Sequence, residues 1–584
     1  MSLVENLLNP TLKSTLGMRI IERFMTTAYR WPDNVAVIHG DSSITYGELA
    51  HRAGEIGVGA ARLGAGAGDV VGVLFDKSID AVATMLGLLI QRIAFHPLSK
   101  QSGLERNVAI LRKVRPRFVV TDSGDTGYGI AGLTFIALDL LRNSDDESLR
   151  PPSSVVTNEF AYLISTSGST GFPKTVAITN EAIGNYIEWR LRYYHFSPDS
   201  RLLQFAPLSF DSAISDLFSM FGSGGAVVLV DEKDRINANK ISELIRSERV
   251  THFSIVPSLY ERIIPSISVD SSLVEVTVAG ERLPASLAAA HFNRLSQVRL
   301  VNEYGPCECA IGVSAYHVTK QDAIGCDCLP VGSAIQGVEL RICDEQMKPL
   351  PPNQTGEILI SGLCVAGGYI ADPEETLSHF VSSDGIRMYR TGDVGYADEQ
   401  GCISVIGRTD RMVKIFGNRV HLSEIERVLE KQKEISEAAV IFDDGKLQAA
   451  CVTTLTGEQI RARIKPALPP YMQPSIVAVL SELPMTVNGK RDYSRISEIV
   501  EELMRPDNED IADEAQRKVY GIWRDVLKFS KIRIDDSFFD VGGSSLYVLE
   551  IHHRLQQVFG VNRPIDLLLD ADTIESQARL FGSN

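Results

Sequence analysis

The chain has 584 residues and a formal net charge of −16, from 58 basic and 74 acidic side chains. At roughly 150 residues per domain, this length suggests three or four structural units. With 44% hydrophobic and 23% charged residues, the composition is that of a globular protein and excludes a disordered or collagen-like chain. The acidic balance argues against nucleic-acid binding, because phosphate backbones attract an excess of Lys and Arg.

The sequence shows neither an export signal nor a membrane span. Its N-terminus lacks a charged start, an apolar run and a small-residue cleavage site. The longest apolar run, residues 81–90, is about half of the ~20 residues that a membrane span needs. Eight cysteines are few for a disulfide scaffold, and the pairs Cys307/Cys309 and Cys326/Cys328 lack the CxxC spacing of a zinc site. We expect a cytoplasmic protein with reduced thiols.

Helical patterns alternate with short β-branched runs between residues 20 and 350. The apolar runs predict strands at residues 70–75, 117–121, 225–230 and 251–256. Helices are predicted at residues 79–90 and 240–249. Because buried strands separated by helices form βαβ units, this region predicts an α/β fold with mostly parallel sheets.

The pattern changes near residue 400. Short strands are predicted at residues 401–407, 412–416 and 438–442, with a helix at 422–431. These elements indicate a small separate α+β unit that ends near residue 497. An acid-rich stretch broken by Pro506 follows, and its composition is that of a linker or of a solvated helix end.

The C-terminal segment of about 70 residues has an amphipathic helical pattern of its own. Its apolar residues recur at helical spacing and predict one buried helix face, made of Val548, Ile551, Leu555, Val558 and Phe559. We therefore expect a small helical unit after the linker.

A run of hydroxyl and glycine residues is the most informative segment. It follows an apolar strand pattern and consists of Thr166, Ser167, Gly168, Ser169, Thr170 and Gly171. Glycines permit tight turns that point backbone N–H groups inward, and hydroxyls add donors. Lys174, just beyond Pro173, adds a positive charge suited to phosphate. The segment predicts a phosphate-binding loop, although it is neither a Walker A motif nor a Rossmann GxGxxG fingerprint.

This loop and five further segments resemble the motifs of the adenylate-forming enzymes, which include acyl-CoA synthetases, luciferases and nonribosomal peptide synthetase adenylation domains. The segments are ITYGEL at 44–49, NEYGPCE at 302–308, YRTGD at 389–393, GRTD at 407–410 and NGK at 488–490. The resemblance implies a large multi-sheet α/β core followed by a small, mobile α+β subdomain. The family joins a carboxylate to the α-phosphate of ATP and expels pyrophosphate, so cations must neutralise the anions that meet.

The resemblance also assigns roles to single residues. It implies that ATP is bound by the loop residues 166–171 and by Lys174, Gly280, Asn302, Tyr304, Asp393 and Arg408. Tyr304 would face adenine, and Asp393 would accept from the ribose hydroxyls. Glu308 would ligate Mg²⁺ with Thr170 nearby, because Mg²⁺ prefers hard oxygen ligands. The catalytic cations would be Lys490, Lys174 and Lys414, and Asp410 would be the hinge about which the small subdomain rotates.

The segment 536–546 (DSFFDVGGSSL) resembles the phosphopantetheine site of a peptidyl carrier protein. The resemblance places the attachment on Ser545, with Ser544 in the variable position. A serine at a helix N-terminus is often only an N-cap, but Phe-Phe, Gly-Gly and the preceding linker all match the carrier pattern. A separate phosphopantetheinyl transferase would attach the arm, and the thiolate of the arm would attack the acyl-adenylate.

The segment FDSAIS at 210–215 matches the place where amino-acid-activating members set an Asp against the substrate ammonium. The family's specificity pocket, carried over with Lys490, gives Asp211, Ser212, Ser215, Ser254, Thr277, Ala279, Glu303, Ile311 and Gly312. Glu303 differs from the mostly small or polar residues of this set, because a buried carboxylate is costly unless it has a cationic or donor-bearing partner. The pattern is similar to histidine-activating pockets, and histidine is the first prediction. Another basic or donor-bearing amino acid is the alternative, and a nearby Arg that pairs with Glu303 would remove this argument.

The chain departs from the family pattern at several places. The segment 92–98 (RIAFHPL) stands where a Gly-Ala-Tyr-Val-Pro type of segment is common. Thr175 replaces a common Gly, Cys307 a common Thr, and Phe416 a common Arg. None of these changes removes a residue that adenylation requires, although Phe416 lies in the loop that lines the pantetheine tunnel in the family.

The resemblance implies four segments: an adenylation core at 1–409, its C-terminal subdomain at 410–497, a linker at 498–513 and a four-helix-bundle carrier domain at 514–584. We expect a ligase that adenylates an amino acid and loads its own carrier in nonribosomal peptide or antibiotic biosynthesis. Because no room is left for condensation or thioesterase domains, the amino acid would pass to a tailoring enzyme or another synthetase module. Whether an MbtH-like helper is needed stays open.

Two other functions are kept as alternatives. An acyl- or aryl-CoA ligase would share the fold, but Asp211 and Ser545 argue against it. A catalytically silent carrier scaffold is the other, and the intact catalytic motifs argue against that.

Overall fold

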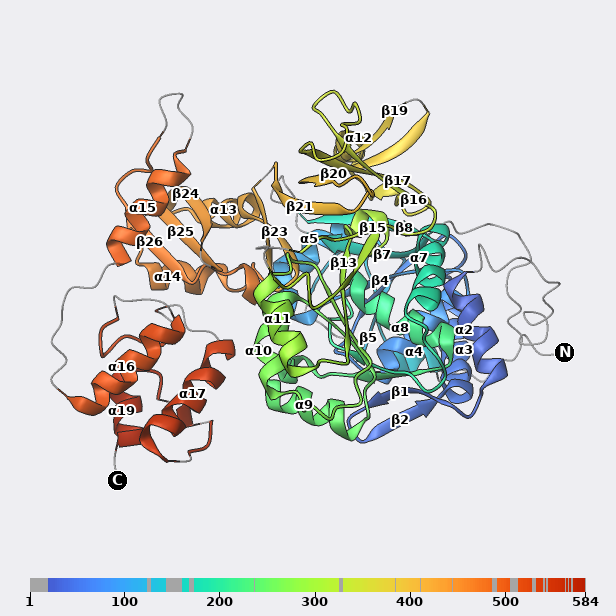
Figure 1. Cartoon of the computed structure of the whole chain (residues 1–584). Helices are drawn as coiled ribbons and strands as arrows, with labels where there is room; N and C mark the ends of the chain where they lie inside the picture. Colours follow the sequence, from blue (N-terminus) through green and yellow to red (C-terminus); the bar gives the residue numbers. More distant parts are fainter. Residues whose placement is uncertain are drawn as a thin grey trace. The chain divides into compact units, whose positions relative to one another are not determined.

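The computed structural model divides the chain into two compact units, with the boundary after Arg419 (Figure 1). It describes residues 19–122, 128–142, 160–166, 173–235, 237–324, 329–383, 385–409, 411–443, 445–485, 491–504, 513–527, 532–538, 541, 545–561, 563–565, 567–568 and 571–582.

A seven-stranded sheet carries the predicted phosphate loop. Its strands, in spatial order, are β18 (Gly368–Tyr369), β8 (Lys174–Thr179), β7 (Phe160–Thr166), β4 (Ala94–Leu98), β3 (Val70–Leu74), β5 (Val119–Thr121) and β6 (Phe135–Ala137). Strands β7 and β8 are antiparallel, and Thr166 pairs with Lys174. Lys174 therefore begins the strand that pairs with the one ending at Thr166, and residues 167–172 between them lie outside the described residues.

A nine-stranded sheet carries most of the predicted specificity residues. Its order is β15 (Ser333–Ala334), β14 (Ser314–Val318), β13 (Arg299–Tyr304), β12 (Glu275–Ala279), β11 (His252–Ile255), β9 (Arg201–Gln204), β10 (Ala226–Leu229), β1 (Val35–His39) and β2 (Ser42–Thr45). The six strands from β13 to β1 run parallel, as the βαβ pattern predicted.

Both faces of the nine-stranded sheet are buried. Leu202 and Val227 point into the core that this sheet shares with the seven-stranded sheet. Leu203 and Val228 point into a second core, under helices α9 (Ala238–Ser247), α10 (Pro257–Ile263) and α11 (Ala285–Arg294). This alternation follows from the two-residue period of a strand.

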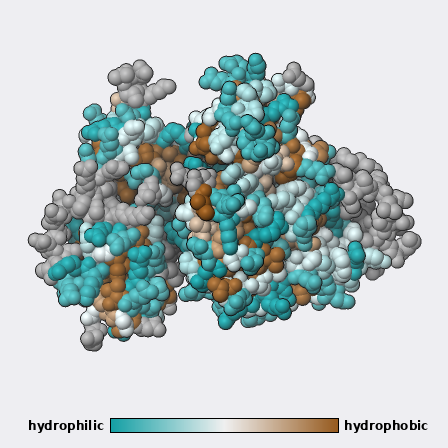
Figure 2. All heavy atoms as spheres, viewed as in Figure 1, coloured by the Kyte–Doolittle hydropathy of each residue, from teal (hydrophilic) through white to brown (hydrophobic). Residues whose placement is uncertain are grey.

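Hydrophilic side chains dominate the face of the molecule seen in Figure 2, and hydrophobic ones are scattered in small groups, as expected when the apolar residues fill the interior.

The helices of the first unit are α2 (Ile20–Arg30), α3 (Tyr46–Arg62), α4 (Ile79–Ile90), α5 (Leu104–Val114), α6 (Leu138–Arg142), α7 (Asn180–Tyr193), α8 (Asp211–Ser223), α9 (Ala238–Ser247), α10 (Pro257–Ile263), α11 (Ala285–Arg294) and α12 (Pro373–His379). Short 3₁₀ turns are η1 (Lys100–Ser102), η2 (Glu232–Asp234), η3 (Ile264–Ser266) and η4 (Cys307–Cys309). Helix α3 begins at a capping box between Thr45 and Glu48, and it packs closely on α4. The close packing requires glycine, since a Cβ on Gly57 would lie 2.5 Å from the carbonyl oxygen of Gly87.

A five-stranded sheet completes the first unit. Its strands are β16 (Val338–Cys343), β17 (Gly356–Gly362), β20 (Ile386–Ala397) and β19 (Phe380–Ser383), with β21 (Ile403–Arg408) paired to β20. Asp393 on β20 lies directly opposite Arg408 on β21. The hairpin of β22 (Met412–Ile415) and β23 (Asn418–His421) follows at the boundary between the units.

The second unit begins with a small α+β subdomain. It contains strands β24 (Ile435–Asp443), β25 (Lys446–Thr453) and β26 (Ile476–Leu480), helices α13 (Leu422–Glu430), α14 (Gly457–Ile464) and α15 (Tyr493–Met504), and the turn η5 (Pro470–Met472). Ile496 and Val500 of α15 pack against the sheet. The large α/β core and the small α+β subdomain that the sequence predicted are thus both confirmed.

The carrier segment forms helices α16 (Glu514–Leu527), α17 (Ser545–Phe559) and α19 (Ile574–Gly582). Trp523 is fully buried among them, and its indole Nε1–H donates to Oε1 of Gln577 at 2.7 Å. Helix α17 begins at Ser545, the predicted attachment residue, although the structure describes only the backbone there.

Several predicted elements match closely, such as α4 at residues 79–90, whereas other predictions differ from the structure. The strand predicted at 117–121 is shorter, with β5 limited to Val119–Thr121. Val558, which was predicted to lie on the buried face of its helix, is 49% exposed near the end of α17. The acid-rich stretch assigned to a linker from residue 498 begins inside α15, whose apolar residues hold it on the sheet. Among the described residues, no helix has the length and apolar character to cross a bilayer.

Candidate active site

Four of the residues assigned to ATP binding and catalysis form one cluster, here called the Tyr304 cluster: Tyr304, Asp393, Arg408 and Lys414. The Tyr304 hydroxyl donates to Oδ2 of Asp393 at 2.6 Å, and Arg408 pairs with Oδ1 of the same carboxylate. The Lys414 ammonium lies 5.8 Å from the Tyr304 ring centroid, within range of a cation–π contact. Burial raises the pKa of Tyr304 and lowers the pKa of Lys414.

Backbone and side chain together fix the position of Asp393. Its N–H donates to Oγ1 of Thr391 at 2.9 Å, and Arg408 Nη2 donates to the Thr391 carbonyl at 2.9 Å. Because a carboxylate has about four lone-pair sites, Asp393 can accept further hydrogen bonds beyond those from Tyr304 and Arg408.

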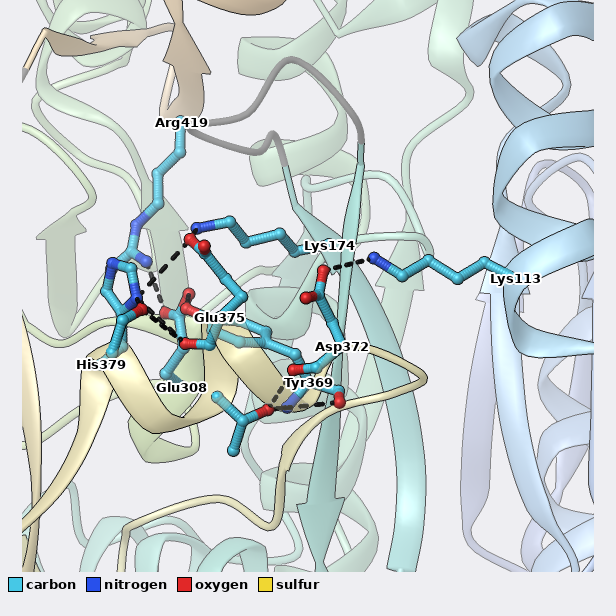
Figure 3. A network of polar contacts seen from close by, with 10 residues as sticks. Lys113, Lys174, Glu308, Tyr369, Asp372, Glu375, His379 and Arg419 are labelled. Atoms are coloured by element: carbon cyan, nitrogen blue, oxygen red, sulfur yellow. Dashed lines mark hydrogen bonds and ion pairs between the residues drawn. The ribbon is translucent and has the colours of Figure 1, made fainter.

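Glu308 lies at the centre of a second network, here called the Glu308 network (Figure 3). Its Oε1 accepts from the Tyr369 hydroxyl at 3.0 Å, and its Oε2 pairs with Arg419 Nη1 at 2.5 Å. Burial alone would raise the pKa of Glu308, but the charge of Arg419 brings this pKa below its usual range. The side chain is therefore an ionised oxygen donor, the kind of ligand that Mg²⁺ prefers.

Lys174 belongs to the same network. Its ammonium pairs with Glu375 on α12, and it lies 5.1 Å from the centroid of the Tyr369 ring (Figure 3). Helix α12 is held by a second pair, because Lys113 donates to Asp372 at 2.7 Å. Lys174 is 4% exposed, so its charge is nearly buried and is balanced by Glu375.

Asp211 opens helix α8, and Ser212 and Ser215 follow on its first turns. Burial raises the pKa of Asp211, while a hydrogen bond with the Cys307 thiol and the charge of Arg419 act in the opposite direction. Arg419 therefore acts on Asp211, the predicted anchor for the substrate ammonium, and on Glu308, the predicted metal ligand.

The remaining specificity residues lie on adjacent strands and in one strained turn. Ser254 pairs with Thr277, and Ala279 pairs with Glu303, so β11, β12 and β13 bring these residues together. Ile311 lies in the turn after η4 with φ +82°, an unusual conformation for a β-branched residue. Strain of this kind is found most often at functional sites.

Glu303 is not an unpaired carboxylate. It is 5% exposed, its Oε1 accepts from the Tyr186 hydroxyl, and its Oε2 accepts from the Tyr194 hydroxyl at 2.6 Å. Arg190 donates to the hydroxyls of Tyr186, at 3.3 Å, and of Ser215. These five residues are here called the Glu303 cluster. They remove the argument that Glu303 needs a partner from the substrate.

Sequence reasoning missed Tyr186, Arg190 and Tyr194, because they belong to no motif. A signal was present, since the three residues follow one another at intervals of four along α7 and its C-cap. Residues spaced in this way share one face of a helix. When that face is buried, the two tyrosine hydroxyls and the arginine guanidinium need hydrogen-bond partners from elsewhere in the chain.

The other predicted residues fall into two groups. Asn302 donates to the Pro330 carbonyl at 2.7 Å, and Gly280 has φ +85°, a conformation that favours glycine. Ser167, Gly168, Ser169, Thr170, Gly171, Asp410 and Lys490 lie outside the described residues.

His96 and Thr175, two residues at which the chain departs from the family pattern, are linked through Ser165. Nε2 of His96 lies 2.9 Å from Oγ of Ser165, which lies 2.9 Å from Oγ1 of Thr175. Burial lowers the pKa of His96 to about 3, so the imidazole is neutral. The chain of hydrogen bonds joins β4, β7 and β8 beside the predicted phosphate loop.

Comparison with known proteins agrees with this arrangement. The family model "AMP-binding enzyme" matches residues 24–370, "AMP-binding enzyme C-terminal domain" matches 424–490, and "Phosphopantetheine attachment site" matches 517–581. The three matches define an adenylate-forming fold followed by a carrier segment. The chain belongs to the AMP-binding enzyme family.

Its similar proteins include two curated synthetases. Malpinin synthetase of Mortierella alpina is 29% identical over 597 residues, which are 96% of this chain and 8% of that protein. Bacitracin synthase 3 of Bacillus licheniformis is 30% identical over 577 residues, 95% of this chain and 9% of that protein. The chain thus spans only a small part of the length of these curated relatives.

A solved structure matches nearly the whole chain. Holo-PA1221, an NRPS protein containing adenylation and PCP domains, is 25% identical with a TM-score of 0.82, and the match covers 98% of both chains. Another solved structure, IdnL1, is 25% identical with a TM-score of 0.69, and the match covers 81% of this chain and 100% of that chain.

Proposed function

We propose that this chain activates an amino acid with ATP and loads it onto its own carrier segment, as part of nonribosomal peptide or related biosynthesis. The observation that carries the proposal is the position of Arg419, which pairs with Glu308 and acts on Asp211. An anchor for an α-ammonium and an ionised oxygen ligand for Mg²⁺ thus lie near one cation, and the Tyr304 cluster supplies groups suited to adenosine.

In the first reaction, a carboxylate oxygen of the amino acid attacks the α-phosphorus of ATP. The new carbon–oxygen–phosphorus bridge forms as the bond to pyrophosphate breaks. The charges of Lys174, and of Lys490 by its motif, would offset the repulsion between the anions. Bound Mg²⁺ would neutralise phosphate charge, and Glu308 is the described residue suited to hold it.

In the second reaction, the thiolate of the phosphopantetheine arm on Ser545 attacks the carbonyl carbon of the aminoacyl-adenylate. A thioester forms and AMP leaves with the bonding electrons. This step requires a phosphopantetheinyl transferase beforehand and a downstream synthetase module or tailoring enzyme afterwards.

For the amino acid we propose histidine first, and another donor-bearing amino acid second. The support is the combination of Asp211 with the small, polar residues Ser215, Ser254 and Thr277. The internal partners of Glu303 change the reasoning, because the side chain would be recognised by the whole Glu303 cluster rather than by a free carboxylate.

ATP–pyrophosphate exchange across the twenty amino acids tests the first reaction. We expect one polar amino acid to dominate and Lys490→Ala to abolish exchange, whereas Lys465→Ala, an exposed control in the same subdomain, leaves it intact. Exchange at background level with every amino acid, or acylation of free CoA in preference to the carrier, would contradict the proposal.

Intact-mass measurement tests the second reaction. After treatment with a transferase and CoA, the wild type and Ser544→Ala should gain a pantetheine arm and then the amino acid. Ser545→Ala should gain neither and should retain pyrophosphate exchange. An arm on Ser545→Ala would move the attachment site.

A further inference from the structure

The Glu303 cluster has a defined direction of hydrogen bonding, because each hydroxyl carries a single proton. Tyr186 and Tyr194 donate their protons to Glu303. In the 3.1 Å contact between Tyr186 and Ser215, the donor must therefore be Ser215. Arg190 donates to Ser215 and to Tyr186. The hydrogen bonds run from Arg190 through Ser215 and Tyr186 to Glu303.

Two of the predicted specificity residues are thus used inside the protein. Ser215 accepts from Arg190 and donates to Tyr186, and Glu303 accepts from two phenols. Gly312 is tied to the same cluster, since a Cβ there would lie 2.2 Å from Oε1 of Glu303. Ser215 bonds Arg190 directly, whereas Glu303 and Gly312 contact Tyr186, to which Arg190 also donates. Arg190 itself is not among the residues that the family pattern assigns to specificity.

The guanidinium of Arg190 is only partly satisfied. Its side chain is 3% exposed, and within the described part of the chain neither Nε nor Nη2 has a hydrogen-bond acceptor. Asp216 is an ion-pair partner at 3.9 Å from Nη1, too distant for a hydrogen bond. The ring centroids of Tyr194 and Phe196 lie 4.7 and 5.7 Å from the central carbon of the guanidinium, and the two rings stack on each other with centroids 5.4 Å apart. Both rings are apolar neighbours that offer no acceptor in the plane of the N–H groups.

A buried charged donor without an acceptor is costly, and an acceptor from a ligand would remove that cost. The neighbouring residues point to the amino-acid pocket as the source. Ser215 is directly bonded to Arg190, and the hydroxyl of Ser254 acts on Asp216. Both serines belong to the set assigned to substrate binding.

We infer that Arg190 is a specificity-determining residue, which selects amino acids whose neutral side chain offers a hydrogen-bond acceptor and disfavours those with a cationic side chain. The inference rests on the proposed adenylation function and specifies the substrate class of that site. Neutral imidazole and the carboxamides have such an acceptor. Lysine and ornithine have none, because a protonated amine can only donate hydrogen bonds.

Pyrophosphate exchange at pH 8 tests the inference, with histidine, asparagine, glutamine, lysine, ornithine and leucine as substrates. Histidine is mainly neutral at this pH, because its side-chain pKa is about 6.5. We expect a neutral acceptor-bearing substrate to exceed lysine and ornithine by about 10- to 150-fold in kcat/KM, the range for a hydrogen bond to a charged group.

Arg190→Met should remove this preference, mainly through a higher KM, while the rate with leucine stays the same or rises. Arg190→Lys, which keeps the charge, should retain part of it. Arg192→Met is the matched control, since Arg192 is exposed on the same helix, and should behave as the wild type.

Three results would overturn the inference. One is a wild type that prefers lysine or ornithine, which is decisive even if Arg190→Met does not fold. Another is an equal loss with all substrates in a folded Arg190→Met, which would make Arg190 structural. The third is exchange with no amino acid at all, which refutes the proposed function itself. The first two results leave adenylation by the wild type intact. Failure of the inference about Arg190 can therefore be distinguished from failure of the proposed function.

Discussion

Glu303 and Tyr304 are consecutive on strand β13, but they belong to two clusters of different kinds. The Tyr304 cluster pairs residues that the motifs had already identified, such as Asp393 and Arg408. The Glu303 cluster pairs a motif residue with side chains from α7 that no motif contains. Because successive side chains of a strand leave on opposite faces, one strand can serve both. The difference shows that a motif identifies a reacting group more readily than it identifies the partners that tune that group.

Asp393→Ala should have the largest effect. It removes the acceptor proposed for the two ribose hydroxyls and leaves the Arg408 guanidinium without its carboxylate. Two hydrogen bonds to a charged group, at about 1.5–3 kcal/mol each, correspond to a loss of about 10²-fold or more in kcat/KM for ATP. Pyrophosphate exchange with titrated ATP measures it, and Glu399→Gln, exposed on the same hairpin, is the control. An unchanged KM for ATP would remove Asp393 from the nucleotide site.

Tyr194→Phe tests the other cluster without changing volume. It removes one donor to Glu303 and leaves a buried carboxylate oxygen unsatisfied, at a cost of about 1.5–3 kcal/mol in the free energy of unfolding. Thermal unfolding measures the loss against Tyr29→Phe, an exposed control. ATP affinity should not change, because Tyr194 has no contact with the Tyr304 cluster among the described residues. A stability equal to that of the control would mean that Glu303 does not depend on Tyr194.

These two predictions concern residues of different kinds: Asp393 was identified from a sequence motif, whereas the role of Tyr194 could not be predicted from the sequence. The strand before the predicted phosphate loop, the assignment of Asp393 and Arg408 to one site and the start of α17 at Ser545 follow from local patterns and short motifs. The partners of Glu303 could not be predicted in the same way, since Tyr186 and Tyr194 lie more than a hundred positions away and reach it only through tertiary packing. The sequence did raise an arginine partner as an alternative, and Arg190 is such a residue, although it acts through hydroxyl groups.

Glu375 shows the same limit on the nucleotide side. The sequence assigned Lys174 to phosphate by its motif, yet the carboxylate that balances this lysine comes from α12, about two hundred residues later. Long-range pairs of this kind are invisible to periodicity and spacing. They determine how much of a group's charge is available to a ligand.

Asp216 provides a test by pH. Burial raises its pKa from 3.8 to about 7, so the folded protein binds a proton that the unfolded chain has lost. This proton stabilises the folded state fully below pH 4, and the contribution disappears as the pH rises to 7. Asp216→Asn lacks the contribution, so its stability relative to wild type should rise by roughly 1 kcal/mol per pH unit between pH 5 and 7.

Denaturant unfolding at several pH values measures this difference, with the exposed Asp199→Asn as control. A constant difference between wild type and Asp216→Asn across this range would show that Asp216 keeps an ordinary pKa. Asp216, the ion-pair partner of Arg190, would then be charged throughout this pH range.

The smallest expected effect concerns the pair of Lys174 and Glu375. If Lys174 binds the phosphates of ATP, the nucleotide must compete with Glu375 for the same ammonium. Glu375→Gln removes the competing charge and should lower the KM for ATP by about 3- to 10-fold, about 1 kcal/mol, with little change in kcat. Glu374→Gln, the exposed neighbour on α12, should leave KM unchanged. A higher KM in Glu375→Gln would mean the reverse, that the carboxylate orients Lys174 for phosphate, and the Glu308 network would then be preorganised like the Glu303 cluster.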